Sequence, residues 1–216
     1  MTGYVIDVVD IFLLFALFGI LHSYLASNEL KRKLKEKYGA LVAFYRIIFN
    51  IISFFSLYII YVISPKPHII IYDLPSPFDL LILIPQFLSL AGFFWTLKYF
   101  CVREFLGINQ IFRWVNNEYN AEELDEHLTL RIEGPYRFSR HPLYLFSILF
   151  LGLRPEMDLF YIMFFLSITA YFFVGSHYEE KKLIERFGSD YKIYRDAVPR
   201  IFPYKFTHPY NKKVYD

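Results

Sequence analysis

The chain has 216 residues, 56% hydrophobic and 21% aromatic, which is more apolar surface than one soluble core of this length needs. Its formal net charge of +2, with no basic stretch interleaved with aromatic residues, argues against a nucleic acid partner. The single cysteine, Cys101, excludes an intramolecular disulfide and a thiolate cluster, and we predict no metal site. The composition therefore indicates an integral membrane protein.

The apolar stretches predict membrane spans, because crossing the hydrocarbon core takes about 20 largely apolar helical residues. Three stretches meet this length: residues 9–26, 42–63 and 78–100. Two more are separated by the turn-like run RPEMD and predict a helical hairpin whose first arm opens at Pro142: residues 142–153 and 159–176. We therefore predict one all-α domain over residues 1–216, a polytopic transmembrane helical bundle of about five spans.

The distribution of Lys and Arg predicts the orientation of these spans, since cytoplasmic loops carry the excess of positive charge. Residues 27–41 hold five such residues, residues 101–141 hold five, and the tail after Ser176 holds nine. Residues 64–77 and the RPEMD turn hold one each. An outside N-terminus, five spans and a cytoplasmic C-terminus bring every rich segment to one side.

The two large inner segments carry a helical pattern of their own. Residues 102–132 alternate charged and aromatic side chains, which is typical of interfacial helices at the depth of the lipid headgroups. After Ser176 the polar run EEKKLIERFG predicts a helix that stops near Gly188, a suitable C-cap. We expect these cytoplasmic helices to form the functional site.

The string GPYRFSRHPLY, residues 134–144, is the most unusual segment of the chain. Glycine and proline set a turn, and Arg137, Arg140 and His141 then precede the helix that opens at Pro142. Backbone N–H groups at a helix start, joined by these cations, favour a carboxylate or phosphate. Anchoring to headgroups explains the arginines taken alone. The whole string, with its turn and its histidine, favours a binding site.

The acidic pair Glu179 and Glu180 follows the last span directly. Carboxylates at the membrane surface beside a cationic pocket predict a zwitterionic or cationic ligand. The spacing allows a second interpretation, in which these residues pair with Lys181 and Lys182 along a solvated helix face for tenths of a kcal/mol, on the order seen for such pairs. Spacing alone leaves both interpretations open.

Polar residues within the predicted spans form a third candidate set: His22 in the first span, and Arg46 and Asn50 in the second. Ionisable groups at depth are costly, so a functional role is the default hypothesis. Both His22 and Arg46 lie near the inner ends of their spans, where snorkelling reduces this cost. Snorkelling without a functional role is therefore a stronger explanation for Arg46 than for His22.

The string GPYRFSRHPLY, followed about 35 residues later by HYEEKKLIERFGSDYKIYRDAVPRIFP, resembles the isoprenylcysteine carboxyl methyltransferase family of integral membrane enzymes. In the N-terminal half, FGILHSYLAS and YRIIFNIISFFSLY are similar to the methanethiol S-methyltransferases and NnrU-type proteins of that family. One position departs from the pattern. Relatives often carry glycine two residues after the tyrosine of RHPxY, where this chain has Phe146, whose ring needs room against the cofactor or a neighbouring helix.

The resemblance implies that S-adenosylmethionine binds on the cytosolic side and that the acceptor enters from the bilayer. We carry the family's cofactor site over to the matching residues of this chain and add Arg137. The predicted cofactor site is Tyr136, Arg137, Arg140, His141, Pro142, Tyr144, Glu179 and Glu180. The implied reaction is methyl transfer to a small hydrophobic thiol such as methanethiol, giving dimethyl sulfide. Such a thiol must lose its proton, and we predict Arg140, His141 or His22 as the catalytic helper.

Two alternatives to this function stay open. The first changes the acceptor to a lipid-like one, a prenylcysteine carboxylate or a phospholipid amine. The second is a non-catalytic membrane interaction or transport protein whose charged inner face binds lipid headgroups or a partner. Membrane lipids are expected partners in every case, and the sequence does not indicate an oligomeric state.

Overall fold

The computed structural model of the chain describes residues 2–120, 129–204 and 210. The described part is predominantly helical and has one small two-stranded sheet, so the predicted all-α class is confirmed. Two compact units make up the chain: residues 1–66 with 101–128, and residues 67–100 with 129–216. Each unit is described below by itself.

The helices of the first unit correspond to the first two predicted spans, the loop between them and the start of the predicted interfacial segment. They are α1 (Thr2–Ala26), α2 (Asn28–Tyr38), the 3₁₀ helix η1 (Gly39–Phe44), α3 (Tyr45–Ile63), α6 (Val102–Phe105) and α7 (Ile108–Val115). Helices α6 and α7 occupy the first part of the predicted interfacial segment, and residues 121–128 of that segment lie outside the described residues.

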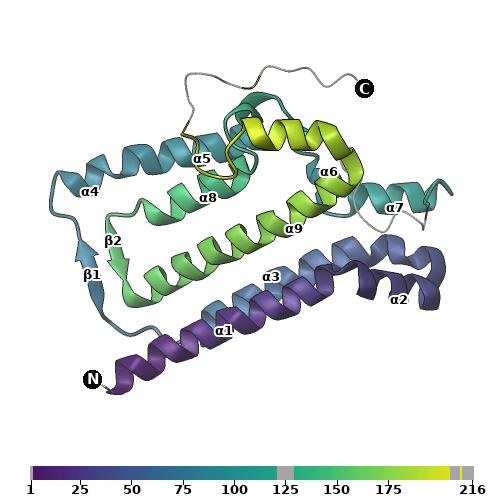
Figure 1. The fold of residues 1–216 in the computed structure, drawn as a ribbon. Coiled ribbons are helices and arrows are strands. Elements are labelled where there is room, and N and C mark those ends of the chain that lie inside the picture. The colour runs from purple at the N-terminus through teal and green to yellow at the C-terminus, as the bar shows by residue number, and fades with distance from the viewer. Residues whose placement is uncertain (1, 121–128, 205–209, 211–216) are drawn as a thin grey trace. The chain divides into compact units, whose positions relative to one another are not determined.

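Helices α1 and α3 run side by side and bury one face of each against the other (Figure 1). Ile11 and Phe15 of α1 and Phe49 of α3 are buried, whereas Phe12 and Leu13 of α1 are more than half exposed. Large apolar side chains pointing away from the core are costly in water and are normal against lipid. This pattern fits a pair of membrane helices.

The second unit contains the other predicted spans and both halves of the two-part motif. Its elements are β1 (Ile70–Asp73), α4 (Phe78–Leu81), α5 (Leu83–Leu97), η2 (Gly134–Arg137), α8 (Pro142–Gly152), β2 (Glu156–Asp158) and α9 (Leu159–Ala197). Helices α5 and α8 lie side by side, and α8 leads through β2 into α9, as the predicted hairpin requires (Figure 1).

Strands β1 and β2 pair antiparallel, with Ile70 opposite Asp158 and Asp73 opposite Glu156. The sequence analysis did not predict this sheet. It joins the loop of residues 64–77 to the RPEMD turn, the two loops assigned to the outer side because they are poor in Lys and Arg. Such short strands satisfy their backbone groups only with a partner, and that partner is distant in sequence.

Four helical stretches among the described residues are long and apolar enough to cross a membrane: Tyr4–Ala26, Asn28–Ile63, Phe78–Leu97 and Leu159–Ala197. A shorter apolar helix is α8, Pro142–Gly152. These helices fit a multi-pass membrane protein. The five-span arrangement and the sidedness of the chain stay predictions.

Helix α9 has an apolar half up to Ser176 and a charged half beyond it, and it breaks at Gly188. Gly188 has φ +54° and ψ −120°, a conformation that side chains disfavour. The last turns run back from this point (Figure 1), and Tyr191, Tyr194 and Val198 form a buried cluster there. The predicted stop near Gly188 is therefore present, and the chain resumes a helix after it.

Candidate functional site

The turn that opens the motif depends on glycine. Gly134 has φ +55°, and a Cβ atom at this position would lie 2.4 Å from the ring of Tyr99. Any other residue would clash there and adopt a strained backbone. Pro135 follows, is buried, and begins the 3₁₀ turn of η2. The glycine and proline thus bring the next residues, Arg137 to His141, back against the unit.

Backbone hydrogen bonds fix the segment just before α8 against a distant part of the chain. The N–H of Arg140 donates to the carbonyl of Pro199 at 2.9 Å, and the N–H of His141 donates to the carbonyl of Arg200 at 2.9 Å. The buried Ser139 hydroxyl also donates to the Arg200 carbonyl, at 3.2 Å. Residues 139–141 and 199–200 therefore form one local structure.

The carboxylate of Glu180 is the centre of the site. Its Oε1 lies 2.9 Å from Nε of Arg140, 3.1 Å from Nε2 of His141 and 3.6 Å from Nε of Arg200. The Glu180 side chain is only 5% exposed, and Arg200 is the most exposed of the three partners at 38%. Burial alone would raise the pKa of Glu180, but His141, Arg140 and Arg200 outweigh it and lower the pKa. Glu180 is thus held as a carboxylate.

His141 lies between the two carboxylates of the acidic pair. Its Nδ1 is 3.2 Å from Glu179 and its Nε2 is 3.1 Å from Glu180. Burial lowers the pKa of His141, but the hydrogen bonds and charges of Glu179 and Glu180 outweigh burial and raise it. Both ring nitrogens donate when the ring is protonated, so this geometry favours the imidazolium.

Tyr144 completes the link between α8 and α9. Its hydroxyl donates to Glu179, and its ring stacks on His141 with centroids 5.3 Å apart and planes at 6°. On its other side the ring stacks on Phe172, with centroids 4.4 Å apart. The tyrosine of RHPxY and the first glutamate of the pair are therefore in contact.

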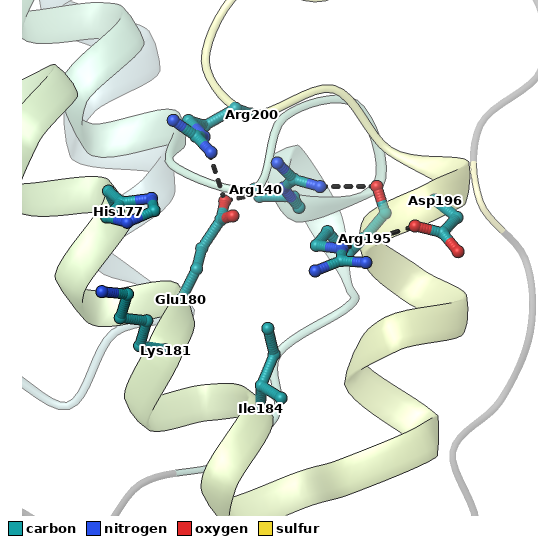
Figure 2. A pocket seen from close by; sticks show the side chains of 8 residues that line it. All are labelled: Arg140, His177, Glu180, Lys181, Ile184, Arg195, Asp196 and Arg200. Carbon is teal, nitrogen blue, oxygen red and sulfur yellow. Dashed lines mark hydrogen bonds and ion pairs between the residues drawn. The ribbon is translucent and has the colours of Figure 1, made fainter.

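A cavity of about 340 Å³ opens beside Glu180 (Figure 2). This volume is at the small end of the range of about 300–1,000 Å³ typical of ligand sites. Its lining has four Arg or Lys side chains against two carboxylates, so it favours a ligand with an anionic group. The lining residues are Arg140, His177, Glu180, Lys181, Ile184, Arg195, Asp196 and Arg200.

The arginines of the cavity differ in how firmly they are held. Arg140 is nearly buried, forms an ion pair with Glu180 and donates a hydrogen bond to the carbonyl of Arg195 (Figure 2). Arg195 pairs with the adjacent Asp196 at 3.4 Å, and their side chains are 39% and 72% exposed. Arg200 approaches Glu180 from the opposite side to α9. Arg140 is therefore committed to the fold, and Arg200 is the more adjustable cation.

The remaining predicted residues occupy different surroundings. Pro142 is buried as the first residue of α8. Burial raises the pKa of Tyr136 to about 12, and its carbonyl accepts from the Tyr194 hydroxyl at 2.6 Å. Arg137 donates to the carbonyl of Tyr210 at 2.9 Å and is not among the cavity residues. These contacts give Arg137 a structural partner, and its cofactor role stays a prediction.

His22 belongs to the first unit, where its ring contacts Phe18 of α1 and Phe49 of α3, with centroids 5.3 and 4.8 Å apart. Arg46 and Asn50 of α3 both donate to the carbonyl of Phe105, at 3.0 and 2.9 Å. The two polar residues of α3 therefore hold the C-terminal end of α6. The catalytic role predicted for His22 stays a prediction.

Sequence reasoning missed Arg195 and Arg200 as cavity residues. Both lie in the second half of the motif, DYKIYRDAVPRIFP, in which we predicted no site residue. A signal was present, because Pro199 and Arg200 follow a helix end and stand within a string that the family resemblance includes. Their contacts with Arg140 and His141 depend on the direction in which the chain continues after the break at Gly188. The local sequence predicts the break but not this direction.

The departure at Phe146 is accommodated by a second glycine. A Cβ atom on Gly92 of α5 would lie 2.3 Å from the Phe146 ring, so the ring occupies the space that Gly92 leaves open. Close helix contact at small residues is common in membrane proteins. The bulky residue of α8 thus fits against the neighbouring helix α5.

Curated relatives match parts of this chain. Methanethiol S-methyltransferase 1 of Bradyrhizobium diazoefficiens is 37% identical over 70 residues, which cover 32% of this chain and 25% of that protein. Methanethiol S-methyltransferase 2 of the same organism is 39% identical over 72 residues, covering 33% and 28%. The Mycobacterium tuberculosis methanethiol S-methyltransferase is 27% identical over 106 residues, covering 49% and 41%.

The matched segments thus span between a quarter and two fifths of the length of these relatives. No family model matches the chain, and no solved structure matches it. Within the matched part, the relatives from several organisms confirm the resemblance to the thiol methyltransferase branch that the two-part motif indicated.

Proposed function

We propose that this chain is an S-adenosylmethionine-dependent methyltransferase of the membrane that transfers a methyl group to a small hydrophobic thiol such as methanethiol. The observation that carries the proposal is the convergence of the two motif halves. Arg140, His141 and Tyr144, at or just before the start of α8, contact Glu179 and Glu180 of α9, and Arg140 and Glu180 also line the cavity. The names of the matched relatives support the same activity.

The side chains of the cavity suit this cofactor. S-adenosylmethionine supplies, when bound, a methyl group on a sulfonium sulfur. Arg195 and Arg200 offer charge-assisted donors for a carboxylate, while Glu180 and Asp196 offer acceptors for an ammonium or hydroxyls. Carboxylates at the site also favour the positive charge of a sulfonium. A cavity lined by charges of both signs therefore fits a zwitterionic ligand.

Methyl transfer to a thiol forms one sulfur–carbon bond, breaks another and releases the thiol proton. The chain mainly has to align donor and acceptor and exclude water. A cation lowers the pKa of a nearby thiol, and a free thiol near pKa 8.5 is already partly ionised at neutral pH. The charge of His141 as an imidazolium is balanced by Glu179 and Glu180, and His141 does not line the cavity, so the helper role predicted for it stays a prediction.

The proposal includes a cytoplasmic site and an acceptor that enters from the bilayer. The charged half of α9 and the motif before α8 lie in the segments rich in Lys and Arg. A small thiol partitions into apolar surroundings, and α8 and the first half of α9 are apolar helices. The acceptor would thus reach the polar site from the membrane side.

The deciding experiment is calorimetric titration of the detergent-solubilised chain with S-adenosylhomocysteine. We expect micromolar binding that is lost in Glu180→Ala and His141→Ala. Glu29→Ala serves as the control, because Glu29 is an exposed carboxylate whose partner is Lys33 on the surface of α2. No heat from folded native chain would favour the non-catalytic alternative.

Binding alone does not identify the acceptor, so a second assay follows it. Native chain incubated with S-adenosylmethionine and methanethiol should release dimethyl sulfide, detected by gas chromatography. Prenylcysteine and phospholipid amines are offered in parallel. Methylation of one of these, with no dimethyl sulfide, would overturn the thiol assignment and retain the methyltransferase.

A further inference from the structure

Tyr191 is the most unusual polar residue near the site that the proposed function leaves unused. Its side chain is 1% exposed, and its hydroxyl has no hydrogen-bond partner among the described residues. Burying a hydroxyl without a partner costs on the order of 1–3 kcal/mol. Nearly all buried polar groups in folded proteins have partners, so an exception calls for an explanation.

The neighbouring Tyr194 belongs to the same buried cluster, but its hydroxyl has a hydrogen-bond partner. Its ring lies edge-on to Tyr191 with centroids 5.9 Å apart, and it is 2% exposed. The Tyr194 hydroxyl donates to the carbonyl of Tyr136 at 2.6 Å. The two tyrosines therefore share burial and packing and differ in the use of the hydroxyl.

Tyr191 lies next to the lining of the cavity. It is one helical turn before Arg195, which lines the cavity and whose carbonyl accepts from Arg140. Ile184, another lining residue, packs against the cluster of Tyr191, Tyr194 and Val198. Burial raises the pKa of Tyr191, and the nearby charges of Glu180 and Arg140 also act on it. The hydroxyl thus stays protonated and can serve as a donor.

The charge of the cavity indicates which ligand group this donor would meet. Arg140, Lys181, Arg195 and Arg200 line it, and Glu180 already forms ion pairs with Arg140 and Arg200 and a hydrogen bond with His141. A carboxylate of the ligand is the group that a neutral donor and an adjustable arginine hold together. The ammonium and hydroxyls of the ligand need acceptors instead.

We propose that Tyr191 is a further ligand-binding residue, whose hydroxyl donates to the carboxylate of the bound amino-acid portion of the cofactor. This inference rests on the proposed function, because it assumes an adenosyl amino acid as the ligand. Among the described residues the hydroxyl has no partner without ligand, and the bound ligand would supply one. Tyr191 would therefore stabilise the complex and destabilise the free fold.

This combination of effects leads to a specific test with Tyr191→Phe. Removing the hydroxyl should weaken binding of S-adenosylhomocysteine at least about tenfold, as expected for one hydrogen bond to a charged group. The melting temperature of the free variant should equal or exceed that of the native chain, since an unpaired buried hydroxyl is removed. Calorimetry measures the first effect and a thermal melt measures the second.

Three controls make the test selective. Tyr194→Phe removes a satisfied hydroxyl and should lower the melting temperature. Tyr58→Phe changes an exposed tyrosine of α3 and should change neither quantity. Decarboxylated S-adenosylhomocysteine lacks the group that Tyr191 is proposed to meet, so native chain and Tyr191→Phe should bind it equally.

The outcomes separate this inference from the proposed function. Native chain that binds no S-adenosylhomocysteine overturns both. Native binding that Tyr191→Phe leaves unchanged overturns the inference alone, and so does a lower melting temperature of the free variant, which would mean that the hydroxyl has a structural partner. If Tyr191→Phe lost as much affinity for the decarboxylated analogue as for S-adenosylhomocysteine, the assignment of the hydroxyl to the ligand carboxylate would be wrong.

Discussion

At the scale of single residues, the chemistry of the site depends on how charges are shared around Glu180. One oxygen faces Arg140, His141 and Arg200, and two of these partners are nearly buried with it. Removing one partner of a buried pair typically costs about 3–5 kcal/mol, because the other charge is left uncompensated. Variants at Glu180 must therefore be compared for stability as well as for binding.

His141 predicts a pH dependence of stability. Its raised pKa means that the folded chain holds the proton more tightly than the unfolded chain. The stabilisation is therefore complete below the ordinary value of 6.5 and is lost as the pH rises through the raised pKa. We expect the melting temperature of native chain to fall as the pH rises through this raised pKa, and that of His141→Gln to fall less.

Thermal melts across a pH series, with both chains in the same detergent, measure this difference. Glu180 acts with the opposite sign: its stabilisation is present above its ordinary pKa of 4.5 and is lost as the pH falls through the lowered one. The two contributions thus fall in separate pH ranges. Parallel curves for native chain and His141→Gln above pH 6.5 would contradict the charged state assigned to His141.

At the scale of elements, the break in α9 is what brings the second half of the motif to the first. Helix α9 would otherwise continue straight beyond Gly188, away from Arg140. Because the chain turns there, the carbonyls of Arg195, Pro199 and Arg200 accept from the segment of Arg140 and His141. The site is thus built by a helix break as much as by its charged side chains.

Two glycines of α9 form a matched pair that tests this role. A Cβ atom would meet nothing within 4 Å at Gly175 or at Gly188, but only Gly188 has a positive φ, +54°. We expect Gly188→Ala to cost about 1–3 kcal/mol of stability, the usual range for a strained backbone, and to weaken binding of S-adenosylhomocysteine.

Gly175→Ala should change stability by no more than about 1 kcal/mol and leave binding intact. Thermal melts and calorimetry on both variants measure these effects. Equal behaviour of the two variants would mean that the conformation at Gly188 does not hold the end of α9 in place.

The contact between α5 and α8 gives a second prediction at this scale. Gly92→Ala places a methyl group within 2.3 Å of the Phe146 ring, and overpacking of this kind costs about 1–3 kcal/mol. The double variant Gly92→Ala with Phe146→Ala should lose less stability than the sum of the two single variants, because removing the ring makes room. Strictly additive losses would show that the two residues do not compete for the same space.

At the scale of the whole molecule, the exposed surface and the charge pattern both indicate a chain that crosses a membrane. Large exposed side chains on the described helices include Phe54, Phe55, Phe87 and Leu88, at 56% to 68% exposure. Loops rich in Lys and Arg alternate with loops poor in them. The predicted outer loops also pair with each other as β1 and β2.

Cys101 allows the predicted sidedness to be measured. It is the only cysteine of the chain, it is exposed, and it begins the segment of residues 101–141 assigned to the cytoplasm. We expect a membrane-impermeant maleimide to label it in inside-out vesicles and not in intact cells. The control is Cys101→Ser combined with Lys66→Cys, which should give the opposite pattern. Labelling of native chain in intact cells would mean that the topology is the reverse of the predicted one.

The amino-acid sequence by itself was sufficient for the helical class and the positions of the apolar helices, and it supplied the candidate residues of the site. Hydrophobicity over about 20 residues decides a membrane helix locally, and charge in the loops is also a local property. The helix stop at Gly188 is likewise decided by the local sequence. His141, Tyr144, Glu179 and Glu180 stood out because each half of the motif is short and continuous.

Only the tertiary structure decided how these pieces meet. The pairing of β1 with β2, the hydrogen bonds between residues 139–141 and 199–200, and the fit of Phe146 on Gly92 join segments far apart in the sequence. Whether Glu180 faces lysines of its own helix or Arg140 and Arg200 was open from spacing, and so was the unpaired hydroxyl of Tyr191. Such contacts depend on the path of the whole chain, because packing and hydrogen-bond partners are chosen in space.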